Sequence, residues 1–127
     1  MKTEQLEELK ALISSVNSSD KFKPFACYDK HLDCIRVQLI DCSFTEERNN
    51  RFITTLRANH MAGEHVGFNI KGVRYLFEQL GLGVTGVHML TTIIDKMVQI
   101  YPDAALERVK RDYLPFIREE NLSVSFA

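Results

Sequence analysis

Hydrophobic and polar residues alternate along the second half of the stretch 24–41, and this spacing is typical of a half-buried β-strand. Ile35, Val37 and Leu39 fall on one side of that strand, with polar residues between them. An apolar arm precedes it, and polar turn-forming residues join the two arms. The pattern therefore predicts a β-hairpin over 24–41.

The same alternation recurs in two shorter segments. Residues 65–70 place three apolar side chains on one face and predict a third strand. Residues 122–126 alternate in the same way and predict a terminal strand. Such a strand is able to close the edge of the sheet, either within one chain or across a dimer.

Apolar residues spaced three and four positions apart predict helices in the rest of the chain. The predicted helices span 3–16, 44–60, 72–80, 85–101 and 104–119. The first has a narrow apolar stripe, which suits a surface position or packing against a second copy of the chain. Pro115 lies inside the last, where a proline predicts a kink or break near Leu114.

The predicted helix over 44–60 begins directly after Ser43, and Ser43 and Glu46 have the spacing of a helix capping box. A strand is predicted on each side of it. The segment 34–70 is therefore compatible with a parallel strand–helix–strand crossover, which would be right-handed.

Together these elements predict one α+β domain over residues 1–127. A small, mostly antiparallel sheet would consist of the hairpin 24–41, the strand 65–70 and the terminal strand 122–126, with four or five helices covering it. Hydrophobic residues make up 45% of the chain, enough for a core without disulfides or metal.

Charge is evenly balanced, with 16 basic and 17 acidic side chains and a net charge of −1. Neither half of the chain is a polycation, so the sequence disfavours nucleic-acid binding. The first residues lack an apolar segment, and no window is as apolar as a membrane span of about 18 residues. Three cysteines without an export signal predict reduced thiols, a cytoplasmic location and no membrane contact.

The stretch 81–86 matches G-x-G-x-x-G through Gly81, Gly83 and Gly86. A dinucleotide loop requires a strand before these glycines, whereas a helix is predicted there. The pattern favours Gly81 as the end of one helix and a new helix from Thr85. Gly83, Thr85 and Gly86 then become candidates for binding a small anion through free N–H groups at a helix start.

The same stretch also suits the turn of a helix-turn-helix motif. Phe77, however, occupies a position where the two helices need a small side chain. The helix expected from Thr85 begins without the side chains that read base edges. DNA binding is therefore the third hypothesis.

The hairpin tip is compatible with a two-residue loop at 30–31 or a four-residue loop at 29–32. Both place Cys27 opposite Cys34 and Tyr28 opposite Asp33. The two thiols would then lie close to disulfide geometry, although two reduced cysteines facing each other explain the pattern as well. His60 and His65 flank a short loop, but no metal-binding spacing is present. The sequence predicts no metal and no cofactor.

The leading hypothesis is a non-enzymatic interaction module that associates with itself, as a homodimer, or with another protein. This hypothesis is favoured because no catalytic or ligand-binding motif in the sequence has the structural context that the motif requires. The alternative is a ligand-binding protein or enzyme with a pocket between the hairpin and the stretch 81–86. The candidate pocket residues are His31, Asp33, Cys34 and His65.

Overall fold

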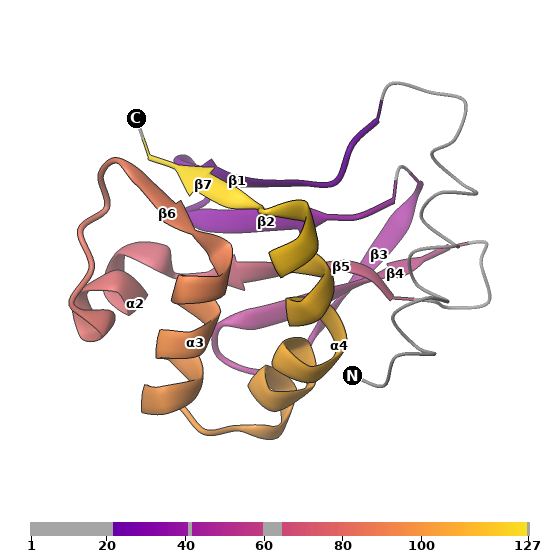
Figure 1. Ribbon diagram of the computed structural model, residues 1–127. Coiled ribbons are helices and arrows are strands. Elements are labelled where there is room, and N and C mark those ends of the chain that lie inside the picture. The colour runs from indigo at the N-terminus through magenta and orange to yellow at the C-terminus, as the bar shows by residue number, and fades with distance from the viewer. Residues whose placement is uncertain (1–21, 41, 60–64, 127) are drawn as a thin grey trace.

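A computed structural model of the chain describes residues 22–40, 42–59 and 65–126. The predicted helix over 3–16 and His60 lie outside the described residues. Five strands form the main sheet, which is antiparallel throughout and has the order β1-β2-β5-β4-β3 (Figure 1). The strands are β1 Phe25–Asp29, β2 Cys34–Gln38, β3 Phe44–Arg48, β4 Ile53–Ala58 and β5 His65–Lys71.

The hairpin predicted over 24–41 and the strand predicted over 65–70 are both confirmed. They form β1, β2 and β5, and β5 lies between β2 and β4. Ile35 pairs with Ile70 and Val37 pairs with Phe68, so these side chains share one face of the sheet. All four are fully buried, because the helices cover this face.

The helix predicted over 44–60 is wrong, because this segment is the second hairpin, β3–β4. Asn50 makes the turn: its side-chain oxygen accepts hydrogen bonds from the backbone N–H groups of Phe52 (2.8 Å) and Ile53 (2.7 Å). The run Ile-Thr-Thr that follows is β-branched, which favours a strand over a helix. The parallel crossover is also wrong, since β2 and β5 are antiparallel neighbours.

The described residues contain three helices rather than the four or five expected: α2 Val73–Leu80, α3 Leu90–Ile100 and α4 Ala104–Glu120. Helix α2 agrees with the prediction over 72–80, and α4 agrees with that over 104–119. The break expected near Leu114 does not occur, because α4 continues through Pro115. Leu114 and Phe116 are buried on either side of the proline, and their packing offsets the lost hydrogen bond.

The helix predicted over 85–101 begins at Leu90 instead of Thr85. The residues before it form strand β6 (Val87–Met89), which pairs with the terminal strand β7 (Ser123–Ser125). The backbone N–H of Leu90 then donates to the Leu122 carbonyl at 3.1 Å. This pairing joins residues more than thirty positions apart, so helical spacing alone does not predict it.

The terminal strand therefore forms, but it does not extend the main sheet. Strands β6 and β7 make a separate two-stranded sheet (Figure 1). The rings of Phe126 and Tyr28 lie 4.7 Å apart and bring the chain end against β1.

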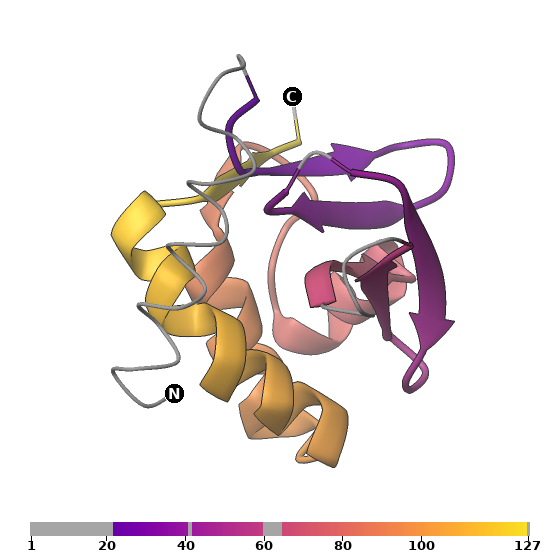
Figure 2. The ribbon, with the colours of Figure 1, turned by 90° about the vertical axis from the view of Figure 1, so that its right-hand side faces the viewer.

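The core lies between the three helices and one face of the main sheet. Figure 2 shows α3 and α4 on one side and the curled sheet on the other. Phe68 of β5 contacts Tyr113 of α4, with ring centroids 5.4 Å apart. Each of the described helices is too short or too polar to cross a membrane.

Candidate functional site

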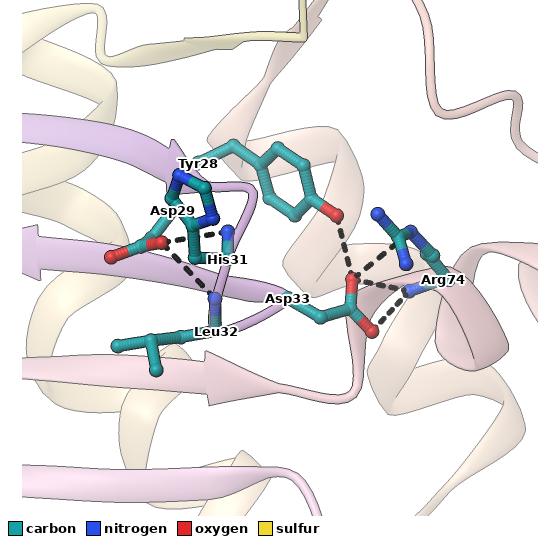
Figure 3. A network of polar contacts seen from close by, with 6 residues as sticks. All are labelled: Tyr28, Asp29, His31, Leu32, Asp33 and Arg74. Carbon is teal, nitrogen blue, oxygen red and sulfur yellow. Dashed lines mark hydrogen bonds and ion pairs between the residues drawn. The ribbon is translucent and has the colours of Figure 1, made fainter.

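The tip of the first hairpin is shaped by two aspartates (Figure 3). The carboxylate of Asp29 accepts hydrogen bonds from the backbone N–H groups of His31 (3.0 Å) and Leu32 (3.1 Å). Asp33 closes the turn in the left-handed region, with φ 50°. The tip is thus a rigid four-residue loop, and Asp29 pairs with Cys34.

Asp33 joins the hairpin tip to helix α2. Its carboxylate accepts hydrogen bonds from the Tyr28 hydroxyl (2.6 Å) and from the backbone N–H of Arg74 (3.1 and 3.2 Å). Its backbone carbonyl accepts the N–H of Val73 at 3.1 Å. Gly72 stands at the N-cap position and has no side chain to offer. Asp33 therefore caps α2 from another part of the chain.

This network also sets the electrostatics of Tyr28. Burial raises the pKa of its hydroxyl, and the hydrogen bond to Asp33 and the charge of Asp33 raise it further. Tyr28 therefore stays protonated and donates to the carboxylate. Arg74 Nε lies 4.0 Å from the same Asp33 oxygen, and the charge and hydrogen bonding of the Arg74 side chain offset part of the rise in the pKa of Tyr28.

A pocket of about 370 Å³ opens beside this network. It is lined by Tyr28, Lys30, Arg74, Val84, Ser125 and Phe126. The lining comes from the hairpin tip, the start of α2, the glycine stretch and the chain end. We call it the hairpin pocket. It lies between the hairpin and the stretch 81–86, the place that the sequence indicates for the alternative function.

The hairpin pocket combines aromatic and basic side chains. Tyr28 and Phe126 form an aromatic wall, with ring centroids 4.7 Å apart. Lys30 and Arg74 contribute two positive charges, and Asp33 next to them contributes one negative charge. The pocket therefore has a net charge of +1, which suits a single anionic group.

The structure brings only part of the predicted pocket set to this place. Asp33 lies under the pocket through its contacts with Tyr28 and Arg74. Cys34 is buried, and its thiol donates to the Ile35 carbonyl at 3.6 Å. His31 is exposed on the turn. The backbone of His65 pairs with Arg57 at the far end of β5, six residues or about 20 Å from the strand end near Cys34.

The expected contact between Cys27 and Cys34 is wrong by two residues. Cys27 pairs with Arg36 instead, because Asp29 still belongs to β1 and pairs with Cys34, so the loop spans residues 30–33 rather than 29–32 or 30–31. None of the three cysteines forms a disulfide. Burial raises the pKa of Cys34, which disfavours its reactive thiolate.

The glycine stretch ends a helix as expected. Gly81 adopts φ 72°, and its N–H donates to the Glu78 carbonyl, an arrangement typical of a C-terminal glycine. Gly83 and Thr85, two of the candidate anion-binding residues, direct their carbonyls at His88 Nε2, at 2.8 and 3.1 Å. Gly86 also has φ 72° and accepts the N–H of Phe126.

Because α3 begins at Leu90, no helix start with free N–H groups lies at Thr85. Nine residues separate α2 from α3 and include β6, whereas a helix-turn-helix motif has a turn of about three or four residues. The helix start expected at Thr85 and the short turn of a helix-turn-helix motif are both absent from this stretch, and anion binding by Gly83, Thr85 and Gly86 stays a prediction.

Sequence reasoning missed most of the lining of the hairpin pocket. Arg74 and Val84 lie far along the chain from Tyr28, and Phe126 lies farther still. Only the exposed position of Arg74 on the predicted helix 72–80 was a usable signal. In the part of the chain that the structure describes, no three His, Cys, Asp or Glu side chains are grouped to hold a metal ion.

Comparison of the chain with protein-family models, with curated proteins and with solved structures gave no match.

Proposed function

We propose that this chain is a non-enzymatic binding module that takes an aromatic carboxylate in the hairpin pocket. The observation that carries the proposal is the pairing of Lys30 and Arg74 with the aromatic wall of Tyr28 and Phe126. A guanidinium binds a carboxylate through two parallel hydrogen bonds. The aromatic ring of the ligand would be stabilised by packing against the rings of the wall. The net charge of +1 matches one carboxylate.

The polar groups under the pocket support binding rather than catalysis. The Tyr28 hydroxyl is engaged as a donor to Asp33, and its raised pKa makes it a poor base. The Asp33 carboxylate is engaged in capping α2. These contacts hold Arg74 and Tyr28 in place before a ligand arrives, which lowers the entropic cost of binding.

Calorimetric titration tests the proposal, with benzoate as the probe and neutral benzamide for comparison. Benzoate is expected to bind and benzamide to bind at least about tenfold more weakly, because a hydrogen bond to a charged group contributes about 1.5–3 kcal/mol. Arg74→Gln is expected to weaken the affinity for benzoate by about tenfold. This substitution keeps the backbone N–H that Asp33 caps, so the fold is retained.

Arg108→Gln is the matched control, because it removes one exposed positive charge from α4, away from the pocket. It should leave benzoate affinity unchanged. Equal binding of benzoate and benzamide, or equal losses in Arg74→Gln and Arg108→Gln, would contradict the proposal.

Self-association stays a prediction. The terminal strand, one of its two motivations, pairs with β6 inside the chain, and the other, the stripe over 3–16, lies outside the described residues. Self-association is favoured instead by two exposed apolar side chains on β6, Val87 (66% exposed) and Met89 (37% exposed). Sedimentation should give twice 14.6 kDa at micromolar concentration; a 14.6 kDa species excludes the dimer. A cytoplasmic location and the absence of nucleic-acid binding also remain predictions.

A further inference from the structure

A second pocket, of about 410 Å³, lies at the turn between β3 and β4. Its lining is rich in charged side chains: Glu46, Arg48, Arg51, Thr54 and Lys71. We call it the sheet pocket. It shares no residue with the hairpin pocket, and the function proposed above does not use it.

Strand register places the sheet pocket on the face of the sheet away from the helices. Arg48 pairs with Thr54, Thr54 with Asn69, and Asn69 with Arg36. Directly opposite residues share a face, so these four side chains form one polar row across four strands. The neighbouring row contains Ile53, which faces the core.

The sheet pocket has an excess of positive charge. Its lining carries three positive charges and one negative charge, which leaves a net charge of +2. The negative charge of Glu46 is engaged from two sides: its Oε1 accepts from Asn69 Nδ2 at 2.6 Å and lies 3.7 Å from Lys71 Nζ. Among the described residues, neither Arg48 nor Arg51 pairs with a carboxylate.

The two arginines keep hydrogen-bond donors available. The guanidinium of Arg51 lies over the rings of Tyr75 (4.7 Å) and Phe52 (5.3 Å). Such stacking uses the face of the guanidinium and leaves its N–H groups in the plane for an anion. Arg48 donates one long hydrogen bond, 3.4 Å, to the Asn50 carbonyl.

The turn that carries Arg51 is held firmly. Asn50 Nδ2 donates to Asp103 Oδ1 at 2.9 Å, and Asp103 caps α4 through the N–H groups of Ala105 and Leu106. The hydrogen bond from Asn50 lowers the pKa of Asp103, so the carboxylate stays charged and the link persists at neutral pH. The position of the turn is therefore tied to a helix.

One buried acceptor in the polar row lacks a donor. Asn69 is 2% exposed, and its Oδ1 has no hydrogen-bond partner in the described part of the chain. Buried polar atoms are nearly always paired. An O–H donor that arrives with a ligand, or with a water molecule bound beside it, would complete the row.

We propose that the sheet pocket binds the phosphate group of a small phosphomonoester. A phosphate dianion matches the net charge of +2, and arginine forks bind its oxygens in pairs. Lys71, whose Nζ lies 3.7 Å from Glu46 Oε1, adds a third positive charge to the lining. The ligand class therefore differs from the monoanionic carboxylate of the hairpin pocket, and the two proposals stand independently.

The test is a calorimetric titration of the full chain with glycerol 3-phosphate, inorganic phosphate and glycerol. Both phosphates are expected to bind, and glycerol is not. Arg48→Gln and Lys71→Gln should each weaken phosphate binding by about tenfold, because each removes a charged donor. Arg51→Lys keeps the charge but loses the planar fork, so it should weaken binding severalfold.

Two control variants place the site. Arg74→Gln, in the hairpin pocket, and Arg108→Gln, on α4, should both leave phosphate affinity unchanged. Circular dichroism and melting curves check that every variant is folded. Absence of phosphate binding at millimolar concentration, unchanged affinity in Arg48→Gln and Lys71→Gln, or an equal loss in Arg108→Gln overturns the proposal. Loss in Arg74→Gln alone also overturns it, since the phosphate would then occupy the hairpin pocket.

Discussion

Phe77→Ala is expected to destabilise the protein by about 3–5 kcal/mol, the usual cost of truncating a buried phenylalanine. Phe77 is fully buried on α2. Its ring lies 5.3 Å from that of His88 and 5.1 Å from that of Phe126. The substitution removes the ring contacts of α2 with strand β6 and with the residue that follows β7, and it leaves a cavity.

Urea unfolding at neutral pH measures this loss. Glu78→Ala on the exposed side of the same helix is the control and should change stability by less than about 0.5 kcal/mol. Because Phe126 lines the hairpin pocket, Phe77→Ala should also weaken benzoate binding. A loss below about 1 kcal/mol would mean that the aromatic cluster is not packed as described.

Gly67→Ala should lower the free energy of unfolding by about 3 kcal/mol, near the upper end of the range for overpacking a core. A Cβ atom at residue 67 would lie 2.2 Å from the backbone carbonyl oxygen of Val37. That oxygen belongs to β2, which β5 pairs with in the centre of the sheet. The backbone has no low-cost way to move, so the two strands would have to separate.

The matched control is Gly83→Ala. The nearest atom to a Cβ there is Thr85 Oγ1 at 3.4 Å, an ordinary contact. That variant should unfold close to the wild-type midpoint, whereas Gly67→Ala should melt roughly 10 °C lower. Similar midpoints for the two variants would show that the β2–β5 approach is looser than the structure indicates.

These substitutions also separate fold from function. Arg74→Gln and Arg48→Gln remove charged groups from the surface and should leave stability nearly unchanged, while each weakens the binding of a different ligand by about tenfold. Phe77→Ala lowers stability and binding together. The comparison therefore distinguishes a residue that contacts a ligand from one that supports the pocket wall.

The sequence by itself determined the elements whose apolar spacing reflects their own burial. The hairpin 24–41, the strand 65–70 and the helices at 72–80 and 104–119 were predictable for this reason. Gly81 was predictable as a helix end because a glycine in the left-handed region allows backbone N–H groups to donate to the last free carbonyls of the helix. Each of these signals is local and is read within about ten residues.

Only the tertiary structure decided the rest. Residues 44–58 satisfy a helical capping pattern, yet Asn50 and pairing with β5 make them a hairpin. Residues 87–89 fit a helix, yet pairing with β7 makes them a strand. Both pockets likewise assemble from side chains distant in sequence. Such pairings depend on which segments meet after folding, and the burial and hydrogen bonds gained there exceed the small local preferences.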